Sequence, residues 1–314
     1  MSHEIESMMY STEGGRYVPW HKLGTPVENA VNSAEALELA GLDWEVQSRP
    51  IFTDNNLLIP GYIANTRSSD NKVLGVVSDK YKIVQNKDAF AFTDNLLDNE
   101  AKYVTAGSLR GGKNVWMLAQ LPSTKILGDD VDNFLCFTNT HDGTGAVKCA
   151  VTNVRVVCNN TLNLALKNAS RTWRCRHSSS VNDKLAEASK CLELANNYTE
   201  ELTKVAERAA NITLTSDDLY NYITTLLPID DNMSDRQKRN VEQSRIDLSN
   251  CMIAIDLRPF YKTAWGFINA VSDFVYHTPP KRQTATYAEN KMFDVIDGNS
   301  ILNSAYELCL NNIS

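Results

Sequence analysis

Long apolar runs are missing from this sequence. No apolar stretch approaches the ~18 residues that a membrane-spanning helix needs. Residues 1–15 contain neither a basic region nor an apolar segment, so they do not read as a secretory signal peptide. We therefore expect a soluble protein of the cell interior that makes no contact with a membrane.

Paired cysteine motifs are missing as well. The chain has seven cysteines, an odd number, and no two of them form a Cys-x-x-Cys motif. Most lie in apolar stretches, such as Cys136 in FLCF, which is typical of buried free thiols in a reducing compartment. A zinc site made of Cys149, Cys158, Cys175 and His177 would lack the paired short spacings of structural zinc. Burial would also leave Cys158 inert as a nucleophile. We expect no bound metal.

The familiar catalytic signatures are absent too. The sequence contains no P-loop, no Rossmann fingerprint and no HExxH motif. His141 and Asp142 are a possible catalytic pair, but the Gly-rich segment THDGTG around them has the composition that a turn needs. We read the N-terminal WHKLGT, Trp20 to Thr25, as structural. The expected protein is therefore not an enzyme and carries no cofactor.

Strand-like runs dominate the chain before residue 158. Apolar and β-branched residues cluster in short segments bounded by Gly, Pro, Asn or Asp. The Gly111-Gly112 pair predicts one hairpin turn, and residues 141–145 predict another. After Pro122 we expect an acidic loop that contains Asp129, Asp130 and Asp132. The expected strands are WEVQSRPIF from Trp44, LIPGYIANTR from Leu58, KVLGVVS from Lys72, KYVTAGSL, NVWMLAQL, FLCFTNT, AVKCAVT and VRVVC.

Helical periodicity dominates after residue 158. Apolar residues recur at three-to-four spacing from Ser180 to Ala210, which predicts a long amphipathic helix. Two short helices are expected earlier, one with Ser33 as its N-cap and one from Lys87 to Leu97 with Asn86 as its N-cap. The other expected helices span residues 159–169, 216–226, 234–254, 263–276 and 300–312.

This order of elements predicts an α+β fold, with a mainly antiparallel sheet in the N-terminal half followed by a helical C-terminal half. A run of strands followed by a run of helices lacks the crossover connections that a parallel sheet requires. We place a β-rich region at residues 1–178 and a helical region at residues 179–314. The two are expected to pack together as one unit.

Acidic residues are missing from one long stretch. The net charge of −7 argues against nucleic-acid binding by the whole surface. Between Gly143 and Asn182, however, there is no Asp or Glu. This stretch is the strongest candidate for a surface that binds an anion. Its basic residues are Lys148, Arg155, Lys167, Arg171, Arg174 and Arg176.

The most basic part of this stretch interleaves arginines with an aromatic residue, in the order RTWRCRH from Arg171. Arginines neutralise phosphates, and a Trp offers a flat face on which an unpaired base stacks. The alternative is a solvated loop whose arginines pair with acidic residues elsewhere in the chain. The predicted single-stranded nucleic-acid site consists of Lys148, Arg155, Lys167, Arg171, Trp173, Arg174 and Arg176.

Four separated segments resemble the phage/plasmid-like protein family known as domain of unknown function 932. They are WHKLGT (20–25), VSDKY with VQN (77–81 and 84–86), HDG followed by RVVCNNTL (141–143 and 155–162), and TAWG with NAV (263–266 and 269–271). The resemblance covers residues 18–310. It implies a mobile-element source and a location in the cytoplasm of a bacterial host cell.

The β-then-α order is also similar in architecture to Rad52-like phage single-strand annealing proteins, which form rings and hold DNA in a basic groove. That resemblance implies a homo-oligomer that binds single-stranded DNA. The leading hypothesis is therefore a non-catalytic phage protein that binds single-stranded nucleic acid in recombination or replication. The alternative is a phage protein that binds and modulates a host protein through its basic segment.

Overall fold

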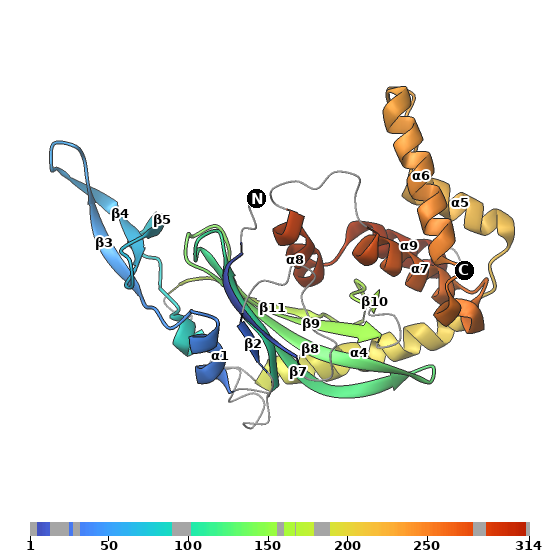
Figure 1. Cartoon of the computed structure of the whole chain (residues 1–314), viewed down its shortest axis with the longest axis horizontal. Helices are drawn as coiled ribbons and strands as arrows, with labels where there is room; N and C mark the ends of the chain where they lie inside the picture. Colours follow the sequence, from blue (N-terminus) through green and yellow to red (C-terminus); the bar gives the residue numbers. More distant parts are fainter. Residues whose placement is uncertain are drawn as a thin grey trace.

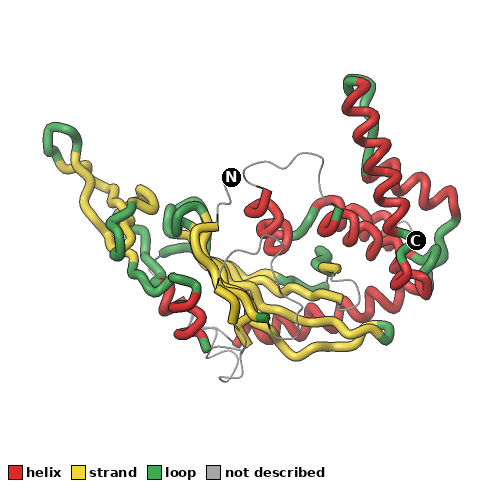
Figure 2. Tube along the Cα trace, viewed as in Figure 1, coloured by secondary structure: helices red, strands yellow, loops and turns green. Residues whose placement is uncertain are grey.

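The computed structural model describes residues 5–12, 25–27, 32–89, 102–155, 160–166, 168–178, 189–278 and 287–311. Its strands form two sheets. The main sheet has eight strands in the order β10-β9-β8-β7-β6-β1-β2, with β11 paired to β9, and the small sheet has the order β3-β4-β5. Every described pairing is antiparallel except that of β1 with β2. Figure 2 shows helices both along the main sheet and beyond its end. The predicted α+β class is confirmed.

All the described strands lie before residue 176. The main sheet consists of β1 (Ile5–Ser11), β2 (Thr25–Val27), β6 (Lys102–Leu109), β7 (Asn114–Ile126), β8 (Asp129–Thr140), β9 (Val147–Arg155), β10 (Asn160–Thr161) and β11 (Thr172–Cys175). The small sheet consists of β3 (Val46–Phe52), β4 (Leu58–Arg67) and β5 (Val73–Ser78).

Most of the described helices follow the strands; α1 and the helical residues 86–89 come earlier. The labelled helices are α1 (Ser33–Leu39), α4 (Ser189–Ala210), α5 (Ser216–Leu226), α6 (Asp235–Cys251), the 3-10 helix η2 (Ile255–Phe260), α7 (Ala264–His277), α8 (Tyr287–Asp297) and α9 (Ser300–Asn311). The helices α5, α6, α7 and α9 agree with the predicted spans. No helix in the described ranges combines the length and the apolar character that crossing a bilayer requires.

The main sheet has a different cover on each of its faces. On one face, alternate residues such as Phe137 of β8 and Cys149 of β9 join the large core cluster, which also contains Tyr198 of α4. On the other face, Cys136 and Ala150 pack against Ile296 of α8. Figure 1 shows α4 running along one side of the sheet and α8 lying on the other. Because successive side chains of a strand point to opposite faces, the sheet packs against helices on both sides.

The expected acidic loop after Pro122 is wrong. The strand β7 continues through Pro122, and the register of its ladder with β8 shifts beside the proline. The two strands then join at Leu127 and Gly128, whose φ angles are 52° and 91°. Two consecutive positive φ angles match the right-handed twist of a hairpin. Asp129 therefore lies in the ladder of β8.

The helix expected at residues 159–169 is also wrong, because residues 160–166 are not helical. The tyrosine hydroxyl of Tyr198 on α4 donates to the carbonyl oxygens of Leu162 and Leu164, at 3.2 and 2.9 Å. Both leucine side chains are fully buried. Tertiary contacts thus take the carbonyl groups that a helix would use, and they override the local propensity.

Two predicted N-caps are replaced by other arrangements. Asn32, not Ser33, caps α1, and its side chain and that of Glu35 bond reciprocally to the backbone. The side chain of Asn86 does not cap a helix, because it is bonded to Leu42 and His141. Residues 86–89 are helical, and the rest of the helix expected up to Leu97 lies outside the described residues. The same holds for the expected helical residues 180–188, since α4 is described from Ser189.

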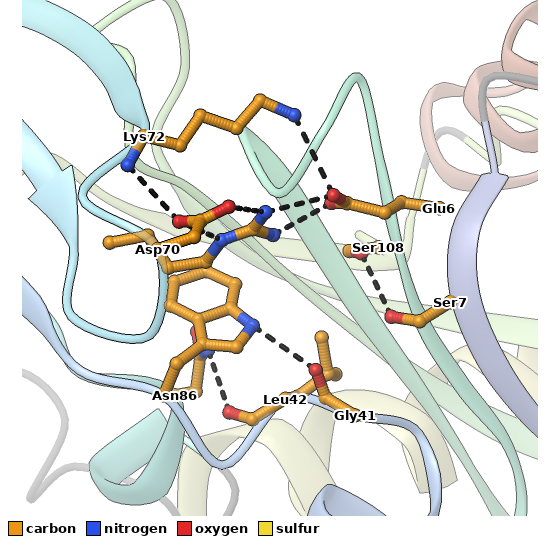
Figure 3. A network of polar contacts seen from close by, with 10 residues as sticks. Glu6, Ser7, Gly41, Leu42, Asp70, Lys72, Asn86 and Ser108 are labelled. Atoms are coloured by element: carbon orange, nitrogen blue, oxygen red, sulfur yellow. Dashed lines mark hydrogen bonds and ion pairs between the residues drawn. The ribbon is translucent and has the colours of Figure 1, made fainter.

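A charged network fastens the small sheet to β1 (Figure 3). The guanidinium of Arg67 donates to both carboxylate oxygens of Glu6, at 2.8 and 2.9 Å, and to Asp70 at 3.0 and 2.6 Å. The ammonium of Lys72 lies 3.6 Å from Glu6. The hydrogen bonds from Arg67 lower the pKa of the Glu6 carboxyl. A partly buried Arg with two acidic partners thus anchors a sheet that otherwise projects from the molecule (Figure 1).

The projecting part of the small sheet exposes apolar side chains. Phe52 and Leu58 are cross-strand neighbours and are 53% and 59% exposed. Tyr62 and Val76 are exposed as well. Groups of exposed apolar side chains commonly mark a contact surface.

Candidate functional site

The strand β11 places the basic segment at the edge of the main sheet. Arg174 pairs with Lys148 of β9, and the next pair along the ladder is Cys175 with Val147. Cross-strand partners point to the same face, and successive residues point to opposite faces. Arg174 and Lys148 therefore share the face on which α8 lies, whereas Cys175 points into the core. No part of the sequence pattern had predicted a strand here.

The predicted role of Trp173 as a stacking platform beside the arginines is not supported by its position. Trp173 precedes Arg174 in the strand, so the two side chains lie on opposite faces of the sheet. The Trp173 ring is partly buried and packs against the main core. Interleaving in sequence thus separates these side chains in space, because the segment is a strand and not a loop.

Arg171 does not lie on the predicted binding surface. Its side chain is buried, and its guanidinium donates to the carbonyl oxygens of Val151 at 2.9 Å and Ile296 at 2.6 Å. Burial lowers the pKa of this guanidinium. Arg171 therefore ties β9 to α8, and it has no exposed group to offer a ligand.

Lys148 has an internal partner. Its ammonium lies 2.7 and 2.9 Å from the two carboxylate oxygens of Asp297 at the end of α8. For this residue, the alternative of neutralisation by an acid elsewhere in the chain holds. Two further predicted residues are not fully covered by the structure. Lys167 lies outside the described residues, and so does the side chain of Arg155. The backbone of Arg155 pairs with Val131 and Asn160.

Arg174 and Arg176 remain as exposed cations. Within the described ranges, neither guanidinium makes a hydrogen bond or an ion pair. The segment after β11 runs beside Lys82, because the amide of Lys82 donates to the carbonyl of His177 and the His177 ring bonds to the carbonyl of Lys82 at 2.9 Å. Lys82 is also exposed. We call Lys82, Lys148, Arg174 and Arg176 the cationic strip.

Sequence reasoning missed Lys82 as a member of the strip. Lys82 and His177 are 95 positions apart in the sequence. The Tyr81 ring stacks on the His177 ring, with their centroids 4.5 Å apart, and this contact brings the two segments together. A local pattern carries no signal for such a long-range pairing.

The HDG segment begins a turn in which His141 is buried where the two sheets meet. His141 is fully buried, and its Nε2 lies 3.0 Å from the side-chain oxygen of Asn86. The amide of Asn65 donates to the carbonyl of His141 at 2.9 Å, and Tyr81 donates to the carbonyl of Thr140 at 2.6 Å. Burial lowers the pKa of His141 to about 3. We call Asn65, Tyr81, Asn86, Asn139 and His141 the buried polar cluster; Asn139 belongs to it because its amide donates to the carbonyl of Val84.

The geometry of this turn does not favour a catalytic pair. The Asp142 carboxylate accepts from the backbone amide and the hydroxyl of Thr144, at 2.9 and 2.6 Å, as an Asp does when it stabilises its own turn. The neighbouring Gly75 leaves no room for a side chain against Asp142. These contacts support the interpretation of residues 141–145 as a turn.

The described thiols are mostly buried. Cys136, Cys149, Cys175, Cys191 and Cys309 are buried free thiols. Burial raises the pKa of Cys136 and of Cys309 to about 12, which leaves them protonated and unreactive at neutral pH. Of the residues considered for zinc, Cys158 lies outside the described part of the chain.

The fold and the site define an α+β protein in which a cationic strip lies beside the buried polar cluster. The chain matches the family described as domain of unknown function DUF932 over residues 73–294, and it belongs to that family. Three of the four resembling segments fall inside this range, and WHKLGT lies before it. No curated protein and no solved structure gives a significant match.

Proposed function

We propose that this protein binds single-stranded nucleic acid along the cationic strip and acts without catalysis. The observation that supports this proposal is the pair of exposed guanidinium groups of Arg174 and Arg176, which lack a partner among the described residues. Exposed cations at the end of a strand and directly after it are suited to bind successive phosphates. The resemblance to phage and plasmid proteins favours a role in the recombination or replication of a mobile element, inside a bacterial cell.

The charge distribution supports a local binding site. With a net charge of −7, most of the surface repels a polyanion. The acid-free segment from Gly143 to Asn182 contributes three members of the strip, and Lys82 adds a fourth from a distant part of the chain. Binding is therefore expected at one place and to depend steeply on salt.

The proposal is tested by oligonucleotide binding measured over a range of salt concentrations. We expect Arg174→Ala and Arg176→Ala each to weaken binding to a fluorescent 20-mer to a similar degree on any sequence. Each should also make the salt dependence shallower by about one counterion. Arg239→Ala on the exposed surface of α6 is the matched control and should change neither quantity. Unaltered binding by both strip variants would place the site elsewhere.

A second candidate function is binding to a partner protein. The observation that favours it is the group of exposed apolar side chains on the small sheet, Phe52, Leu57, Leu58, Tyr62 and Val76. Failure of the wild-type protein to bind any oligonucleotide would favour this candidate. A charged substitution, Leu58→Lys, should then abolish complex formation with the partner without changing stability, since Leu58 is exposed.

Self-association is part of the main proposal. A second group of exposed apolar residues, including Ile253 and Ile255, lies by α6, and Figure 1 shows α6 at the end of the molecule away from the small sheet. Two such surfaces at opposite ends permit head-to-tail contacts between copies, which close into rings or extend into filaments. Sedimentation of the wild type and of Leu58→Lys over a range of concentrations tests this part of the proposal.

A further inference from the structure

A small cavity of about 140 Å³ adjoins the cationic strip. It lies on the α8 face of the main sheet, between the end of β6, the turn at residues 141–146 and α8. Its lining includes Arg110, Asn114, Thr138, Thr140, Lys148 and Ile296. Lys148 thus belongs both to the strip and to the cavity, so a strand bound along the strip passes its mouth.

Two polar atoms in the wall of this cavity lack partners. The side-chain oxygen of Asn114 and the hydroxyl of Thr140 are buried and make no hydrogen bond to any described residue. Asn114 is only 7% exposed, and it is the cross-strand partner of Thr140 in the β7–β8 ladder. A buried polar group without a partner is costly, so such groups commonly bond to a ligand or to ordered water. Both residues line the cavity and are neighbours in the ladder, and each has one polar atom without a partner among the described residues.

The rest of the wall limits what fits. Leu109, Ala146 and Ile296 supply apolar surface, and Arg110 is exposed at the rim. A volume of about 140 Å³ corresponds to roughly five water molecules at ~30 Å³ each. That is too small for a drug-sized ligand, which occupies roughly 300 Å³ or more. It suits one flat, partly polar ring with hydrogen-bonding groups on its edge.

We propose that this cavity receives one unstacked base of a nucleic-acid strand whose phosphates lie along the cationic strip. This inference rests on the proposed function. The oxygen of Asn114 accepts from an amino or imino N–H of the base, and the Thr140 hydroxyl bonds to a neighbouring edge atom. The apolar residues cover the faces and sides of the ring. A base inside a duplex cannot enter, so the cavity selects single strands.

A base-binding cavity accounts for a preference for single strands that Trp173 does not explain. With its ring packed on the core, Trp173 offers no stacking platform beside Arg174. Preference for single strands then comes from a base held in a cavity, at the same edge of the sheet as the phosphate contacts. Lys148, which lines the cavity, is paired with the Asp297 carboxylate at the end of α8.

The test compares two oligonucleotides with the same phosphates, a mixed-sequence 12-mer and its counterpart with abasic sites at every position. Wild-type protein should bind the abasic strand about tenfold more weakly, the loss expected for one bound base. The variant Thr140→Val removes the hydroxyl with little change in shape, and Ala146→Leu fills the cavity. Each should bind both strands with the same, lower affinity, and each should keep the wild-type salt dependence.

The control Thr225→Val lies on α5, away from the cavity, and should discriminate between the strands as the wild type does. Unfolding midpoints of all variants show that they are folded, and Thr140→Val serves if Ala146→Leu is not. If folded Thr140→Val and Ala146→Leu keep the tenfold discrimination, the cavity does not hold a base, and phosphate binding by the strip still stands. If wild-type protein binds neither strand, the proposed function and this inference fail together.

Discussion

The buried polar cluster and the cationic strip lie next to each other, joined by the Tyr81–His177 contact, and they use polar side chains in opposite ways. In the cluster, the side-chain amides of Asn65, Asn86 and Asn139 each donate to a backbone carbonyl of a distant segment. In the strip, Arg174 and Arg176 extend into solvent. The side chains of the cluster are neutral and have internal partners. In the strip, Lys148 has Asp297, but the guanidinium groups of Arg174 and Arg176 have no partner among the described residues. A polar residue that holds the fold is thus distinguished from one that meets a ligand by where its hydrogen bonds go.

Arg171 sharpens this comparison. It lies three positions before Arg174, but its side chain holds the fold together and is not available to a ligand. Replacing it by Met removes two hydrogen bonds from a charged donor to the carbonyls of Val151 and Ile296. We expect Arg171→Met to lower the free energy of unfolding by about 3 kcal/mol. Arg174→Met, the matched control, should change it by less than about 0.5 kcal/mol. Urea unfolding of both variants measures the difference, and a larger loss in Arg174→Met would reverse the assignment.

The next largest effect is expected inside the buried polar cluster. Asn86→Ala leaves both the His141 ring nitrogen and the carbonyl of Leu42 without a partner. The cost of one or two buried unpaired groups is about 2 kcal/mol. The exposed Asn55 at the tip of the small sheet is the control, and Asn55→Ala should leave the unfolding curve unchanged within error. Equal stability of the two variants would contradict a structural role for the cluster.

The buried histidine gives the comparison a pH dependence. The pKa of His141 is about 3 in the folded state because of burial, against an ordinary value of about 6.5. The unfolded chain therefore takes up a proton that the folded chain refuses. Stability from this group is complete above pH 6.5 and is lost as the pH falls from 6.5 towards 3, by at most about 1.4 kcal/mol per pH unit.

Unfolding free energies measured from pH 7.5 to pH 5 check this expectation, since this window lies above the titration of ordinary carboxylates. In His141→Gln, the unfolding free energy should depend less steeply on pH, by the equivalent of about one proton. Asn55→Ala at the tip of the small sheet, which removes no titratable group, should keep the wild-type slope. An unchanged slope in His141→Gln would show that this histidine takes up its proton equally readily in the folded and the unfolded chain.

The smallest effect on stability is expected in the strip itself. Arg176→Ala and Lys82→Ala replace exposed side chains and should each change the free energy of unfolding by less than about 0.5 kcal/mol. Their effect belongs to binding, where both should reduce the salt dependence. A strip variant that unfolds the protein would show that the strip, like Arg171, is part of the fold.

The local sequence pattern predicted the elements whose own residues contain the signals for a helix or a turn. The helices α5, α6, α7 and α9 have the predicted spans, and a capping residue with a bonded side chain precedes α5, α6 and α7. The hairpin turns at Gly111-Gly112 and at residues 141–145 follow from the need for positive φ or for an Asp turn. Prediction failed where a residue far away in the sequence makes the deciding contact. The hydroxyl of Tyr198, for example, donates to the carbonyls of Leu162 and Leu164.

By itself, then, the sequence determined the α+β class and singled out the acid-free segment as the place to look for an anion. Only the tertiary structure decided which of its residues are available. Pairing of β11 with β9 put Trp173 and Arg174 on opposite faces, and the docking of α8 buried Arg171 and gave Lys148 an acidic partner. Lys82 joined the strip through a contact across 95 positions. A side chain's charge is fixed by its residue type, but its exposure and its partners are set by segments far away in the sequence, and those decide what it can bind.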